Sequence, residues 1–143
     1  MGRILGVDLG TRRVGLAISD PTGTLAGPHG VLERSGDEDA DRRAIVAAAR
    51  EVGAERIVVG LPRSLSGKDG PAARAARAEV AALEAVAGPD LPIELHDERF
   101  STVSATRALA ASSPGRPRRR RRAAGVDAAA AAIILQSYLE SRR

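Results

Sequence analysis

The stretch GVDLGTRRVGLAISD, Gly6 to Asp20, contains two apolar runs joined by a short polar turn. This pattern predicts a β-hairpin with strands over Ile4–Leu9 and Arg13–Ser19. Asp8 lies inside the first apolar run, and small residues at Gly6, Gly15 and Ala17 are expected to leave space beside it. Because an isolated ionised carboxylate is costly in a core, Asp8 requires a partner, a metal ion or contact with water.

Outward from this hairpin, the chain alternates between strand and helix patterns. Strands are predicted over Thr24–Leu32, Arg56–Pro62 and Ile93–Glu98. Helices are predicted over Asp39–Val52, Pro71–Ala87, Ser101–Ala111 and Gly125–Arg143. This order is typical of an α/β fold in which a mixed sheet is flanked by helices, and the length of 143 residues indicates a single domain over 1–143.

Composition excludes several classes of protein. The chain has 43% hydrophobic residues and no cysteine, which rules out disulfides, thiol catalysis and Cys-ligated zinc. No apolar run approaches the roughly 18 residues of a membrane span, and the N-terminus shows no signal-peptide pattern. We therefore expect a cytoplasmic protein without a membrane partner.

Positive charge is concentrated in one segment. The net charge is +4, and it becomes −2 without six arginines: Arg116, Arg118, Arg119, Arg120, Arg121 and Arg122. Such clustering favours a polyanionic partner, and we expect a mobile basic loop over about 112–124 that contacts a phosphate backbone. The alternative is a solvated arginine loop, because 21 of the 22 basic residues in this chain are arginine.

Three acidic residues occupy informative positions. Asp8 lies in the first strand, Glu98 ends the last predicted strand, and Asp127 falls in the first turn of the final predicted helix. If they converge, their oxygens suit Mg²⁺ or Mn²⁺, which can activate water at a phosphodiester. Each acid also has a structural explanation: Asp127 as a helix-terminal acid, and Glu98 as an ion-pair partner of Arg99 or Arg107. His96 is expected to be a hydrogen-bonded strand residue rather than a metal ligand.

Four motifs in order resemble those of the YqgF family, whose members are called Holliday junction resolvases and nucleases that finish the small-subunit ribosomal RNA. They are GVDLGTRRVGLAISD, IVVGLPRSLSGKDGPAA, HDERFST and GVDAAAAAIILQSYL, and the resemblance runs from Arg3 to Leu139. It implies an RNase H-like fold with a five-stranded mixed sheet and helices on both faces. It also places the family's catalytic, metal-binding acids on Asp8, Glu98 and Asp127. The nearly pure arginine run departs from the lysine and arginine mixture of the family.

The leading hypothesis is a nuclease that uses Mg²⁺ or Mn²⁺ and acts on structured nucleic acid, most simply the precursor of small-subunit ribosomal RNA during ribosome assembly. The arginine run, with Lys68 and Arg63, would bind the nucleic acid. The alternatives are a Holliday junction resolvase acting on branched DNA, a non-catalytic RNA-binding module and an ATPase-like domain. The last is disfavoured, because six residues rather than four separate Gly60 from Gly67 and Asp69 follows Lys68. A monomer and a homodimer both remain open.

Overall fold

A five-stranded mixed sheet forms the centre of the protein in the computed structural model, which describes residues 2–62, 68–98 and 119–142. The strands are β1 (Arg3–Leu9), β2 (Arg13–Ser19), β3 (Ala26–Glu33), β4 (Ala54–Leu61) and β5 (Ile93–Asp97). Their order across the sheet is β3-β2-β1-β4-β5. β1 pairs antiparallel with β2, and β2 with β3, whereas β4 runs parallel to both β1 and β5. The predicted hairpin and the α/β mixed sheet are confirmed.

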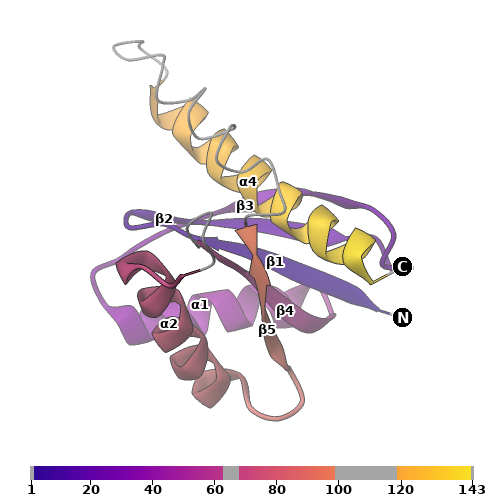
Figure 1. Cartoon of the computed structure of the whole chain (residues 1–143), viewed down its shortest axis with the longest axis horizontal. Helices are drawn as coiled ribbons and strands as arrows, with labels where there is room; N and C mark the ends of the chain where they lie inside the picture. The colour runs from indigo at the N-terminus through magenta and orange to yellow at the C-terminus, as the bar shows by residue number, and fades with distance from the viewer. Residues whose placement is uncertain (1, 63–67, 99–118, 143) are drawn as a thin grey trace.

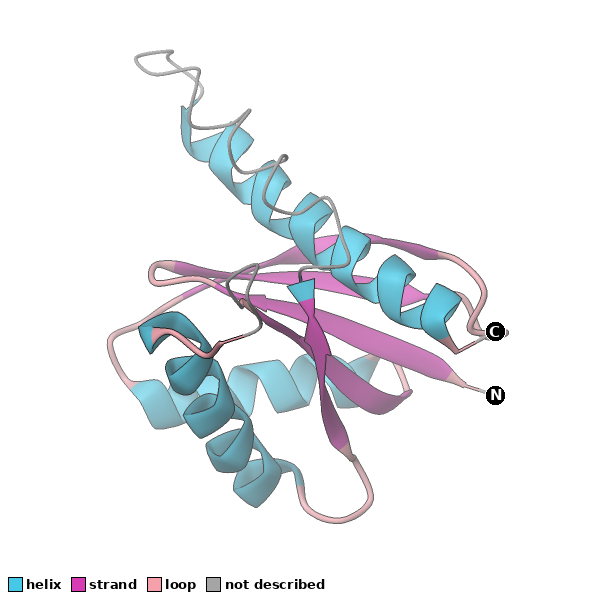
Figure 2. Cartoon of the chain, in the orientation of Figure 1, coloured by secondary structure: helices cyan, strands magenta, loops and turns pink. Residues whose placement is uncertain are grey.

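Helices cover both faces of this sheet, as the family resemblance implies (Figure 1). The helices of the described residues are α1 (Glu38–Glu51), α2 (Pro71–Ala87) and α4 (Arg119–Ser141). One core packs α1 and α2 against the side chains of Leu5 and Val7. A second core packs α4 against Ala17 and Val58 on the opposite face. Figure 2 shows that, of the three described helices, α4 lies on one side of the strands and α1 and α2 lie on the other.

Glycines in the sheet let α4 approach the strands closely. A Cβ atom added at Gly15 would lie 2.0 Å from the backbone oxygen of Asp127. Added at Gly6 or Gly60, it would lie 2.8 Å from Leu135 Cβ or 2.6 Å from Ile134 Cδ1. These separations are too short for real carbon atoms. The open space that the sequence indicated beside Asp8 is therefore taken up by the helix.

The start of α4 differs from its prediction. The helix begins at Arg119 rather than Gly125, so residues 119–124 of the expected basic loop are helical. Arginine and alanine are strong helix formers, and one glycine inside a long, well-packed helix costs only about 1 kcal/mol. The rest of that loop, 112–118, and the predicted helix Ser101–Ala111 lie outside the described residues.

Candidate active site

Asp8, Glu98 and Asp127 all line one cleft at the carboxyl ends of β1 and β4, with a volume of about 950 Å³. Asp8 and Glu98 are buried, with 4% and 7% of their surfaces exposed. Three segments that are far apart in the sequence thus bring acids to the edge of the sheet where open α/β folds bind ligands. Asp8, Glu98 and Asp127 thus face the same cleft, as the sequence suggested they could.

The strand register explains how Asp8 and Glu98 come near each other. Val7 pairs with Val59, so the next residues along the parallel strands, Asp8 and Gly60, are neighbours. A Cβ atom at Gly60 would lie 3.3 Å from both Cγ and Oε1 of Glu98. The Glu98 side chain therefore lies against Gly60, and a larger residue at position 60 would push it away.

Asp127 reaches the cleft from the interior of α4. It is the ninth residue of the helix, beyond the first turn, so its interpretation as a helix-terminal acid is wrong. Its Oδ2 accepts a hydrogen bond from Nε of Arg13 at 2.9 Å, and its side chain is 25% exposed. Ala130, Ala131 and Ile134, which share its side of the helix, are buried against the sheet.

The turn between β1 and β2 is tightly held. Gly10 N–H donates to the carbonyl of Arg13 at 3.0 Å, and a Cβ atom at Gly10 would lie 2.5 Å from that oxygen. Nε of Arg34 donates to the Gly10 carbonyl at 2.6 Å. Neither Arg13 nor Arg34 was identified from the sequence. The polar turn was visible there, but Asp127, the partner of Arg13, is 114 residues away.

The chemistry of these donors fits a divalent cation. Carboxylate oxygens are the ligands that Mg²⁺ and Mn²⁺ prefer, and no softer ligand is needed. Among the described residues, however, no three His, Cys, Asp or Glu side chains are close enough together to hold an ion as they stand. Asp8, Glu98 and Asp127 therefore share the cleft without forming a compact ligand cluster.

Other acids of the cleft, on the side of α1 and α2, have structural partners. Arg42 donates to both carboxylate oxygens of Glu79 at 3.0 Å and contacts Glu38 at 3.5 Å. The hydrogen bond with Glu79 is the main cause of the raised pKa of Arg42. Hydrogen bonds from the side chain and backbone of Ser35 lower the pKa of Asp41 below its usual value of 3.8. These residues join α1 to α2 and to the preceding loop.

Most of the predicted nucleic-acid contacts lie wholly or partly outside the described residues. Arg63, Arg116 and Arg118 lie outside the described residues. Arg119, Arg120, Arg121 and Arg122 have their backbone in α4, but their side chains are also outside. Lys68 is exposed just before α2, whose N-cap is Gly70.

His96 behaves as the structural histidine expected from the sequence. Its Nε2 lies 2.8 Å from Oγ of Ser137, and its ring meets that of Tyr138 edge-on at 5.8 Å. Burial lowers the pKa of His96, although the charge of Asp97 opposes this shift. The residue joins β5 to α4.

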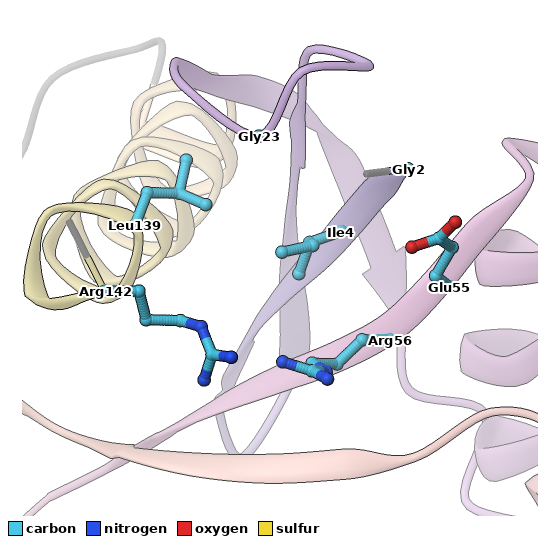
Figure 3. Close-up of a pocket in the computed structure, with 7 residues that line it drawn as sticks. All are labelled: Gly2, Ile4, Gly23, Glu55, Arg56, Leu139 and Arg142. Atoms are coloured by element: carbon cyan, nitrogen blue, oxygen red, sulfur yellow. The ribbon is translucent and has the colours of Figure 1, made fainter.

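A second, smaller cavity of about 160 Å³ lies at the opposite end of β1, beside Gly2 and Ile4 (Figure 3). Arg56 and Arg142 extend toward one another across it. Both contact the carboxylate of Glu94, at 3.4 and 3.8 Å. Arg56 also donates to the hydroxyl of Tyr138 at 2.7 Å. Ion pairs and hydrogen bonds thus join the sheet to α4 at this end.

None of the helices in the described part of the chain is both long enough and apolar enough to cross a bilayer.

Comparison with known proteins supports the resemblance seen in the sequence. Residues 2–141 match the family model described as "RuvX: Holliday junction resolvase". A protein of Pelotomaculum thermopropionicum is 41% identical over 98% of this chain and 88% of its own length. One of Mycobacteroides abscessus is 42% identical over 99% and 83%. One of Kineococcus radiotolerans is 49% identical over 76% of this chain but only 57% of its own length. All three are named "Putative pre-16S rRNA nuclease".

The fold is also found among solved structures. Thermus thermophilus RuvC aligns with a TM-score of 0.54 over 98% of this chain and 95% of its own, at 17% identity. The same protein in complex with a Holliday junction substrate aligns with a TM-score of 0.53, also at 17% identity, over 99% and 96% of the two chains. At this identity the likeness establishes the shared RNase H-like fold, as expected from the resemblance.

Proposed function

This chain belongs to the RuvX (YqgF) family, and from that membership we propose that it is a nuclease that hydrolyses phosphodiester bonds in the precursor of small-subunit ribosomal RNA. The names of its relatives agree with this function. We place its activity in the cytoplasm, during assembly of the small ribosomal subunit, with either a monomer or a homodimer as the acting species.

One observation carries the proposal: Asp8, Glu98 and Asp127, drawn from three distant segments, line a single cleft. Two of the three are buried although they are acidic. Burying carboxylates is unfavourable for stability alone, so their collection at a sheet edge is most simply explained by chemistry performed there.

We assign Asp8, Glu98 and Asp127 as the residues that would hold Mg²⁺ or Mn²⁺. When bound, such a cation supplies a Lewis acid for the phosphate oxygens and a more acidic water as nucleophile. The contribution of the chain is to present the carboxylates from a central strand, the residue after an edge strand and a helix packed on the sheet. The absence of side chains at Gly15 and Gly60 keeps these elements close together.

The substrate backbone would be held by the arginine run Arg116 and Arg118–Arg122. Its last four residues, Arg119–Arg122, begin α4, the helix that carries Asp127. The positive charge of this segment would attract a polyanion that the acidic residues of the cleft repel. Lys68, just before α2, and Arg63 are proposed as further phosphate contacts.

Resolution of branched DNA is the second candidate, because the matching family is described as a Holliday junction resolvase. The test is to incubate the protein with precursor ribosomal RNA and with a four-way DNA junction, each with Mg²⁺, with Mn²⁺ and with chelator. We expect metal-dependent cleavage of the RNA. Cleavage of the junction alone would select the second candidate. Binding of either substrate without cleavage would identify a non-catalytic module, and tight binding of ATP an ATPase-like domain.

A further inference from the structure

Arg13 is the first residue of β2 and binds one of the three proposed metal ligands. Its Nε donates to Oδ2 of Asp127 at 2.9 Å, and the side chains are 20% and 25% exposed. A charged hydrogen bond of this kind is stronger than a neutral one and holds the carboxylate in one direction. The rotamer of Asp127 is therefore set by a protein cation.

The backbones on both sides of this ion pair have little freedom. Arg13 closes the turn through the hydrogen bond from Gly10, whose own carbonyl is held by Arg34. Asp127 is pressed against β2, because there is no room for a Cβ atom at Gly15. Any exchange of partners by Asp127 must then be a rotation of its side chain rather than a shift of α4.

Such an exchange would free Asp127 to join the other two acids if the cleft takes up a metal. As they stand, no three acids of the described residues are grouped closely enough to ligate one ion. Asp127, one acid of the proposed trio, is held by Arg13. Both partners are partly exposed, so the guanidinium can be released without leaving a charge fully buried.

We propose that Arg13 is a positioning residue that holds the Asp127 carboxylate in the metal-free protein and is displaced from it when a divalent cation binds. This inference rests on the proposed function, because it assumes that the cleft takes a metal. Arg13 keeps the charge of Asp127 compensated until then, and it lowers metal affinity because it competes for the same carboxylate.

The test measures Mn²⁺ affinity by calorimetry, together with the melting temperature of the metal-free protein. We expect Arg13→Gln to bind Mn²⁺ roughly three- to fivefold more tightly, the fold-change that corresponds to the upper part of the range for a partly exposed ion pair. Its metal-free melting temperature should fall. Arg13→Lys, which keeps the charge but not the Nε donor, should lie between wild type and Arg13→Gln.

Arg12→Gln is the matched control, because Arg12 lines the same cleft and carries the same charge without a described bond to Asp127. Its exposed charge is screened, so Mn²⁺ affinity should change by no more than about twofold. In an Asp127→Asn background, Arg13→Gln should no longer tighten binding. An equal gain in Arg12→Gln and Arg13→Gln would reduce the effect to net charge and overturn the exchange.

A second measurement needs no variant. The Arg13 Nε–H signal of the wild-type protein, followed by NMR, should be protected from solvent exchange without metal and lose that protection when Mg²⁺ saturates the site. A signal unchanged by saturating Mg²⁺, or an Arg13→Gln protein with wild-type Mn²⁺ affinity, would overturn the proposed displacement of Arg13 but not the proposed function. A wild-type protein that binds neither ion would overturn the metal site of the proposed function as well.

Discussion

Gly15→Ala is the substitution for which the structure makes the sharpest prediction. The added Cβ atom would lie 2.0 Å from the backbone oxygen of Asp127, whereas ordinary contact begins at 3.4 Å. Helix α4 must therefore move away from β2 by about 1.4 Å, the difference between these two distances. Overpacking of this kind costs about 1–3 kcal/mol.

At about 2–4 °C per kcal/mol for a chain of this size, the melting temperature should fall by about 2–12 °C. Displacement of a reacting group by about 1 Å can also reduce the rate roughly 100-fold, so cleavage should suffer more than stability. Scanning calorimetry and an RNA cleavage assay measure the two effects.

The matched control is Gly30→Ala in β3, where a Cβ atom would meet nothing within 4 Å. It should melt at or slightly above the wild-type temperature, because alanine restricts the unfolded chain more than glycine does. If Gly15→Ala keeps both the melting temperature and the cleavage rate of wild type, the close packing of α4 on β2 does not position Asp127.

Three further predictions concern separate parts of the molecule. Asp8→Asn and Glu98→Gln should weaken Mn²⁺ binding, yet each variant should melt at or above the wild-type temperature without metal, because fewer like charges then share the cleft. Thermal melts with and without Mn²⁺ test this prediction. It would be contradicted if both substitutions made the metal-free protein less stable. Replacing Arg118–Arg122 with serine should weaken binding of all nucleic acids alike. Each lost phosphate contact should reduce the slope of log affinity against log salt concentration by roughly 0.7–0.9. An unchanged slope in binding titrations would show that this segment does not contact the nucleic acid. Asp20 accepts hydrogen bonds from Thr22, Thr24 and Leu25, which lower its pKa from 3.8 to about 2. The ionised Asp20 therefore stabilises the folded protein above pH 3.8, and this stabilisation is lost as the pH falls through about 2. Asp20→Asn should therefore lower the melting temperature at neutral pH, with a difference that shrinks below pH 4 in melts across that range; a constant difference would exclude the charge of Asp20 as its cause.

Local signals in the sequence predicted much of the fold. Helix α2 was predicted at its observed bounds because Pro71 is suited to the first turn of a helix and the turn sequence GPDLP begins at Gly88. In the structure Gly88 has a φ of 82°, which glycine adopts readily. The hairpin followed from two apolar runs around a short turn, and the position of Asp8 in the first run pointed to the site.

Features that depend on long-range packing could not be predicted in this way. The start of α4 was placed at Gly125, because the like charges of the arginine run were expected to oppose a helix, whereas the helix begins at Arg119. Gly6 of β1 and Gly15 of β2 were expected to leave a space, whereas α4 fills it. The ion pair of Arg13 with Asp127 joins residues 114 positions apart, and only the assembled sheet and helix bring them together.

The measurement that tests the central claim most directly is cleavage of a precursor ribosomal RNA fragment by wild type, Asp8→Asn, Glu98→Gln and Asp127→Asn, with Mn²⁺ and with chelator. We predict cleavage only by the wild-type protein and only with metal, while all four proteins remain folded. Wild-type cleavage that persists in chelator, or full activity in any of the three folded variants, would contradict a metal-dependent site built from these carboxylates.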